Sequence, residues 1–148
     1  MSDRAEVRTE FAALLTAGLT GPNGPAQAVY RYRVGDFAGQ TPVVVLGSAG
    51  SERKRMSFKG HHAAYWLDLF VFVLYNLKDP AGAVLWSEQQ AEDQLDQIEQ
   101  LIGLLLDGNQ TGASWKAIDY DGRSQIDIVP EGGLPYLREF IPMRFATF

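Results

Sequence analysis

Residues 63–75, AAYWLDLFVFVLY, decide how the rest of the chain has to be arranged. β-branched and aromatic side chains favour a strand here, and the segment is too short to cross a membrane as a helix. A strand with one solvated face alternates apolar and polar residues. In this segment both alternating sets are apolar, and Asp68 is the single charge. We therefore predict that one face is covered by the chain's own helices and the other by a second layer or a neighbouring subunit.

Two amphipathic helices are predicted to supply the first of these layers. The helix from Asp3 to Ala17 has one apolar stripe, formed by Val7, Phe11, Leu14 and Leu15. Ser87 and Gln90 match a capping box that starts a second helix, from Glu88 to about Asp107. At roughly 1.5 Å per residue this helix is about 30 Å long, enough to cover a sheet face. Its apolar stripe consists of Ala91, Leu95, Ile98, Ile102 and Leu105.

Further strands are predicted on both sides of the second helix. Residues 28–34 alternate between apolar and basic side chains, and residues 42–46 are a short β-branched run. Residues 136–147 form a last strand, in which Pro142 indicates an edge position or a bulge. The expected fold is one α+β domain over residues 1–148. It has an antiparallel sheet of about five or six strands, with two helices packed mainly on one face.

A two-residue hairpin is predicted at Asp121-Gly122, because this dipeptide favours a type I′ turn. The flanking segments are WKAIDY and SQIDIV. The turn places Ala117 opposite Ile126 and Lys116 opposite Asp127. This register brings opposite charges together and gathers the apolar residues, Trp115 and Ile128 among them, on one face.

Composition limits the classes of function. The chain has 148 residues, 46% of them hydrophobic, and it contains no cysteine. Disulfides, thiolate metal sites and thiol catalysis are therefore excluded. We expect a soluble, cytoplasmic protein with no membrane contact, because no secretory signal is evident. A net charge of −5 argues against general nucleic-acid binding by the whole surface.

The charge is unevenly distributed. Arg53, Lys54, Arg55 and Lys59 stand against Glu52 between Gly47 and Gly60, which gives 4 − 1 = +3 and leaves −8 for the remainder. We expect a basic loop here that docks on an acidic surface of another copy or of a different protein. The acidic counter-surface would be Glu92, Asp96 and Glu99 on the second helix. The alternative is a solvated connection, since charge runs are weak evidence of binding.

Catalytic patterns were sought, and none was found. His61 and His62 are neighbours on an extended chain and point to opposite sides, so they do not share a metal ion. Asp68 is either a buried functional carboxylate or, in our preferred interpretation, a side chain that reaches the sheet edge or pairs with an arginine across strands. The VVVLG strand followed by GSAG lacks the Gly-Lys-Ser/Thr of a phosphate-binding loop. We expect no enzyme activity, no catalytic residues, no cofactor and no metal.

The order of these elements resembles the tail terminator (tail-completion) proteins of long-tailed bacteriophages and prophage-like elements. The resemblance covers nearly the whole chain and rests on pattern rather than on a sharp motif. It comprises the opening helix, the VVVL strand with its Gly/Ser/Lys/Arg loop, the aromatic strand YWLDLFVFVLY, the acidic helix SEQQAEDQLDQIEQLIGLLLDG and the closing segment YLREFIPMRFATF.

This resemblance implies a structural virion protein that forms a ring, often a hexamer, at the end of the tail tube and joins it to the head-neck. The implied partners are other copies of the chain, the tail tube protein and a neck or head-completion protein. DNA would pass through an acidic lumen without specific binding. The location would be the virion tail or neck, after assembly in the host cytoplasm. The alternatives are a neighbouring neck or head-completion protein or, in a different class, a small-ligand-binding α+β module or a hydrolase.

Overall fold

The long apolar strand lies at the centre of the sheet in the computed structural model, which describes residues 3–55, 61–75, 77–78, 81, 84–120 and 123–147. This strand is β3 (His61–Leu74). The strand order is β1-β2-β3-β8-β6, and β7 also pairs with β8. The remaining elements are α1 (Arg4–Leu19), β1 (Ala28–Tyr30), β2 (Val43–Arg55), β4 (Leu77–Lys78), β5 (Val84–Trp86), α2 (Glu88–Gly108), β6 (Ala117–Asp119), β7 (Gln125–Glu131) and β8 (Leu134–Ala146).

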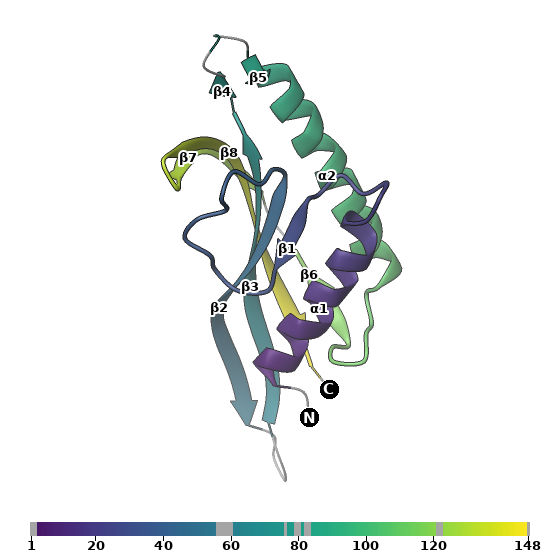
Figure 1. Cartoon of the computed structure of the whole chain (residues 1–148). Coiled ribbons are helices and arrows are strands. Elements are labelled where there is room, and N and C mark those ends of the chain that lie inside the picture. Colours follow the sequence, from purple (N-terminus) through teal and green to yellow (C-terminus); the bar gives the residue numbers. More distant parts are fainter. Residues whose placement is uncertain are drawn as a thin grey trace.

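Both helices lie on one side of this sheet, so the predicted α+β class is confirmed (Figure 1). The predicted capping box starts α2, because Ser87 Oγ accepts the Gln90 amide at 3.1 Å and Gln90 Oε1 accepts the Ser87 amide at 2.9 Å. A second capping box, at Asp3 and Glu6, starts α1 and was not predicted. The apolar stripes of both helices pack on one set of β3 side chains: Tyr65, Leu67, Leu69, Val71 and Val73. We call this side of the sheet the helix face and the opposite side the outer face.

The sheet is antiparallel except at its first pair. β1 runs parallel to β2, with Ala28 opposite Val43. The predicted strand over residues 28–34 therefore ends at Tyr30, and residues 31–42 leave the sheet to connect the two parallel strands. β4 and β5 form a separate two-stranded sheet, in which Leu77 is opposite Trp86.

The prediction of a long basic loop is wrong. Residues 43–55 form one continuous strand, β2, which pairs with β3 from Val43 opposite Phe72 to Arg55 opposite His61. A bulge between Ser48 and Gly50 absorbs the glycine-rich stretch that the sequence indicated as the start of a loop. Arg53, Lys54 and Arg55 are therefore on a strand, while Lys59 lies outside the described residues.

The predicted hairpin register is also wrong. Ala117 is opposite Ala146 of β8 rather than Ile126, and Ile126 is opposite Glu139 of β8. β6 and β7 therefore follow one another along the same edge of β8. The Asp121-Gly122 turn itself lies outside the described residues. Pro142 falls in the interval between the two pairings, so β8 is locally an edge at this residue, which is one of the two positions that the sequence indicated.

The observed two-residue turn is at Gly132-Gly133, between β7 and β8. Both glycines have positive φ, +58° and +80°, the pattern of a type I′ turn. This turn pairs Asp127 with Arg138 and lets β8 pair with β3 from Ala64 to Leu74. Two consecutive glycines allow positive φ at both positions. The register that this turn sets is then stabilised by the pairing of β8 with β3.

Replacing Gly132 with Ala should lower the free energy of unfolding by about 1–2 kcal/mol, because a non-glycine residue is strained at positive φ. The new Cβ would also lie 2.4 Å from Asp36 Oδ1. Denaturant unfolding followed by circular dichroism measures the effect. Gly35→Ala is the matched control, since no atom lies within 4 Å of a Cβ there. Equal unfolding midpoints for the two variants would contradict the turn assignment.

Candidate functional site

Part of the outer face is covered by the chain itself. Residues 31–42 fold over the sheet and insert Phe37, which is 2% exposed, against Phe72 at 4.8 Å and Tyr136 at 5.4 Å between ring centroids. The Tyr136 hydroxyl donates to the Gln40 carbonyl at 3.0 Å, and the Leu74 amide donates to Thr41 Oγ1 at 2.9 Å. The second layer predicted for β3 is therefore an intramolecular segment at this end of the strand.

Arg33, from the same covering segment, contacts the middle of the outer face. Its guanidinium pairs with Asp68 at 3.2 Å and lies 5.6 Å from the ring centroid of Phe70. It also passes directly over Gly47, where an added Cβ would be 2.8 Å from the guanidinium. Asp68 thus has the arginine partner that the sequence indicated. Partial burial raises the pKa of the Asp68 carboxyl, and the Arg33 charge opposes that rise.

Aromatic rings and paired charges continue across β8. Phe140 stacks on Phe70, with 5.2 Å between the ring centroids. The Arg138 guanidinium carbon lies 5.5 Å from the centroid of the Phe70 ring. Arg138 is held by two hydrogen bonds to the Asp127 carboxylate, at 3.1 and 2.8 Å. Such bidentate pairing fixes the plane of the guanidinium.

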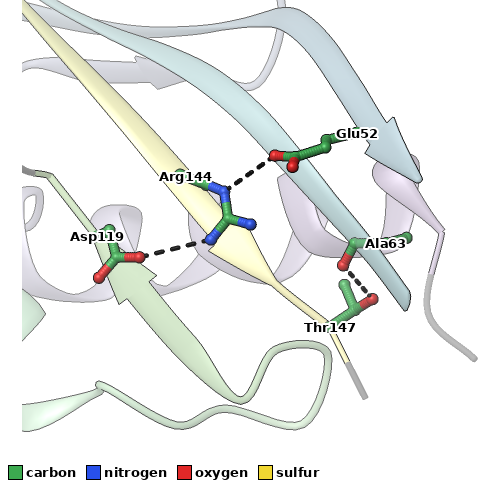
Figure 2. A network of polar contacts seen from close by, with 5 residues as sticks. All are labelled: Glu52, Ala63, Asp119, Arg144 and Thr147. Carbon is green, nitrogen blue, oxygen red and sulfur yellow. Dashed lines mark hydrogen bonds and ion pairs between the residues drawn. The ribbon is translucent and has the colours of Figure 1, made fainter. Parts of the chain in front are cut away.

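Arg144 organises the far end of the outer face. Its guanidinium lies between Glu52 of β2, at 3.4 Å, and Asp119 of β6, at 3.6 Å (Figure 2). Trp66 is directly opposite Arg144 in the β3–β8 register and is 39% exposed. On the described part of this face, each of the three arginines has a carboxylate partner. The surface around Trp66 is therefore aromatic and locally charge-balanced.

The β2–β3 hairpin projects beyond the body of the sheet. The Thr147 amide and hydroxyl both donate to the Ala63 carbonyl, at 2.9 and 2.8 Å, and this marks the last contact with the C-terminal strand (Figure 2). Beyond it, residues 53–55 pair with residues 61–63. We call these two segments the arm. Figure 1 shows the arm extending past the rest of the sheet. Arg53 is exposed on it. The side chains of Lys54, Arg55, His61 and His62 lie outside the described residues.

The acidic side of α2 is open, as predicted: Glu92, Asp96 and Glu99 are all exposed. The arm and this acidic side are not in contact within the described chain. Glu99 also lines a cavity of about 110 Å³, together with Tyr120, Arg123 and Ser124 and with Glu139 of β8.

Glu139 is the buried carboxylate that the sequence interpretation missed. It is 4% exposed and lies on the helix face, opposite Val71 of β3. Ser124 Oγ donates to its Oε2 at 2.8 Å. Burial raises the pKa of the Glu139 carboxyl, the Ser124 hydrogen bond opposes this, and the negative charges of Glu99 and Asp96 add to the rise. A signal was present in the sequence, because in YLREFIPMRF the residue alternates with Leu137, Ile141 and Met143.

Among the described residues there is no group of three His, Asp or Glu side chains placed to hold a metal ion. None of the helices in the described part of the chain has the length and apolar character that a membrane span requires. No model of a known protein family matches the sequence, and no curated protein matches it either.

Replacing Glu139 with Gln should stabilise the fold near neutral pH, by about 2–4 °C in Tm if the gain is about 1 kcal/mol. Gln can still accept the Ser124 hydroxyl and carries no buried charge. A raised folded-state pKa means that Glu139 contributes its stability below about 4.5, its ordinary pKa, and loses it as pH rises through the folded-state value. The advantage of the variant should therefore shrink on acidification.

Thermal unfolding across this pH range, with the exposed Glu92→Gln as control, measures the difference. A variant that is less stable than wild type near neutral pH would show that the ionised carboxylate is a structural requirement.

Proposed function

We propose that this chain is a non-catalytic structural subunit that assembles with copies of itself into a ring. We further propose that this ring terminates the tail tube of a long-tailed phage and joins it to the head-neck. The observation that carries the proposal is the uncovered part of the outer face. There, Trp66 is exposed on the central strand and the nearby charges are already neutralised within the subunit.

Such a face favours contact with protein. Interface cores are depleted of unpaired charge and enriched in aromatic residues and arginine. Removing water from Arg144, already flanked by Glu52 and Asp119, leaves it with partners. A nucleic-acid surface requires cations free to contact phosphates, and the arginines on this face are occupied.

The projecting arm also supports assembly. It is a short two-stranded extension with basic residues, on a chain whose net charge is −5. Contacts between two different surfaces of one subunit are heterologous, and they produce a closed ring when the rotation between copies closes. The phage assignment rests on the resemblance of the element order to tail terminator proteins. The proposed partners are accordingly the tail tube protein and a neck or head-completion protein.

A small-ligand-binding role has less support. Sites for drug-sized ligands are generally about 300–1,000 Å³. The cavity at Glu139 is about 110 Å³, and this space suits the end of one side chain better than a metabolite. The hollow beside Trp66 is larger, about 550 Å³, but it is an open part of the surface rather than an enclosed pocket.

Replacing Trp66 with Ser should weaken self-assembly by about 30-fold, the effect of losing about 2 kcal/mol from an aromatic anchor, while the subunit stays folded. Analytical ultracentrifugation gives the assembly constant, and circular dichroism checks the fold. Tyr32→Ser is the matched control, because Tyr32 is 60% exposed and lies outside the Trp66 region.

Negative-stain imaging of the wild-type protein, with and without tail tube protein, tests the ring and its location. A protein that remains monomeric under all these conditions, and does not bind the tube, would contradict the proposed function. Equal assembly by the Trp66 and Tyr32 variants would exclude the outer face as the contact.

A further inference from the structure

The cavity beside α2 is bordered by a carboxylate oxygen that receives no hydrogen bond from the described part of the chain. Glu139 Oε2 accepts the Ser124 hydroxyl. Within the described chain, no hydrogen bond is made to Oε1. The Glu139 side chain is 4% exposed and borders the cavity, and its Oε1 is not among the fully buried unpaired atoms, so this acceptor is open to the cavity. A largely buried carboxylate is costly unless it is paired or fully hydrogen-bonded.

The ionised side chains that line the cavity have a net negative charge, which one additional cation would neutralise. Its ionisable lining consists of Glu99, Glu139 and Arg123, and these sum to −2 + 1 = −1 when all are ionised. Asp96, one turn before Glu99 on α2, adds further negative charge nearby. In the described part of the chain, no lysine or arginine nitrogen is within 4 Å of the Glu99 or Glu139 carboxylates, Arg123 included.

The lining of the cavity is partly apolar, since it includes Ile102, Leu106 and Ile141. Ile126 is directly opposite Glu139 in the β7–β8 register, so its side chain is on the same face of the sheet, and it is 52% exposed. Apolar side chains beside two carboxylates match a lysine or arginine side chain, which has an apolar stem and a cationic end.

We infer that this cavity receives a lysine or arginine side chain from the arm of a second copy of the chain. The inference rests on the proposed function and names the contact that would join one subunit to the next. The arm is the complementary surface: Arg53 is exposed on it, and Lys54 and Arg55 follow in the same strand. α1 steadies its base, since Arg8 Nη1 donates to Ser48 Oγ at 2.7 Å and Arg4 Nη1 donates to Ser51 Oγ at 3.2 Å.

The cavity, rather than the whole acidic side of α2, is the specific receptor. Exposed ion pairs are weak because water and salt screen them. A cation placed beside Glu139 would meet a desolvated carboxylate, where the loss of one partner has a larger effect. Asp96 would then steer the approach of the arm, while Glu139 and Glu99 would hold its end.

The first experiment measures assembly of the full-length E139Q variant by analytical ultracentrifugation. We expect the assembly constant to weaken at least about 10-fold, with Glu99→Gln acting in the same direction. E92Q on the same helix should change it little. Because E139Q is expected to stabilise the isolated subunit, weaker assembly by this variant would not reflect a folding defect. R123Q removes the cation that the lining already holds, so it should strengthen assembly rather than weaken it.

The second experiment uses the absence of cysteine from the chain. The R53C/E99C double variant, treated with a short bismaleimide, should give covalent dimers and higher species on denaturing gels. R53C/T9C, with the second thiol on α1, should give few. Mixing 15N-labelled and unlabelled chains shows by mass spectrometry whether the linked peptides come from different copies.

The outcomes separate the two proposals. If wild type assembles but E139Q and E99Q assemble equally well, and the 53–99 pair does not cross-link, the cavity is not the receptor and the proposed function stands. If R123Q alone abolishes assembly, Arg123 supplies the cation and the inference is overturned. If wild type does not assemble even with the tail tube protein, the proposed function fails and this inference fails with it.

Discussion

The need to bury both faces of β3 is the constraint on which the rest of the structure depends. Tyr65, Leu67, Leu69, Val71 and Val73 are all at most 1% exposed on the helix face. Full burial of a large apolar side chain contributes about 1.5–3 kcal/mol, so this one row specifies where α1 and α2 have to lie. The outer row is covered by a segment without regular structure, anchored by Phe37. That covering ends near Phe70, and the strand continues past it to Trp66.

The distribution of charge follows from this unequal covering. On the outer face, where side chains lie close together on neighbouring strands, Arg33, Arg138 and Arg144 each have carboxylate partners. The arm and the cavity side of α2 differ, because the first gathers basic residues and the second gathers carboxylates at separate places on the subunit. The outer face can be dehydrated on binding, because its arginines already have carboxylate partners within the subunit. The basic residues of the arm and the carboxylates of α2 are far from one another, so they remain available to another molecule. This division supports the view of the chain as an assembly component.

Much of the fold was accessible from local sequence signals. The two helices, the Ser87 capping box, the α+β class and the central strand depend on periodicity and short-range hydrogen bonds, and they were predicted correctly. The two wrong predictions share a cause. Asp121-Gly122 has a strong local turn preference, but Gly132-Gly133 allows β8 to pair with β3 from Ala64 to Leu74. Likewise, the glycines after Leu46 indicate a loop in isolation, whereas pairing with β3 carries β2 on to Arg55 through a bulge. In both places a long cross-strand ladder outweighs a local preference.

The sequence by itself determined that β3 has two apolar faces, that the basic residues are concentrated at positions 53–59 and that α2 has an acidic side. These properties depend on composition and spacing alone. Only the tertiary structure decided which half of the outer face stays open, that Arg33 reaches Asp68 across Gly47, and that Glu139 lies buried beside a cavity. Those arrangements join residues far apart in the chain, and their positions depend on the strand register and on how the 31–42 segment folds back. A single sequence records neither, because both are fixed by the sum of many long-range contacts.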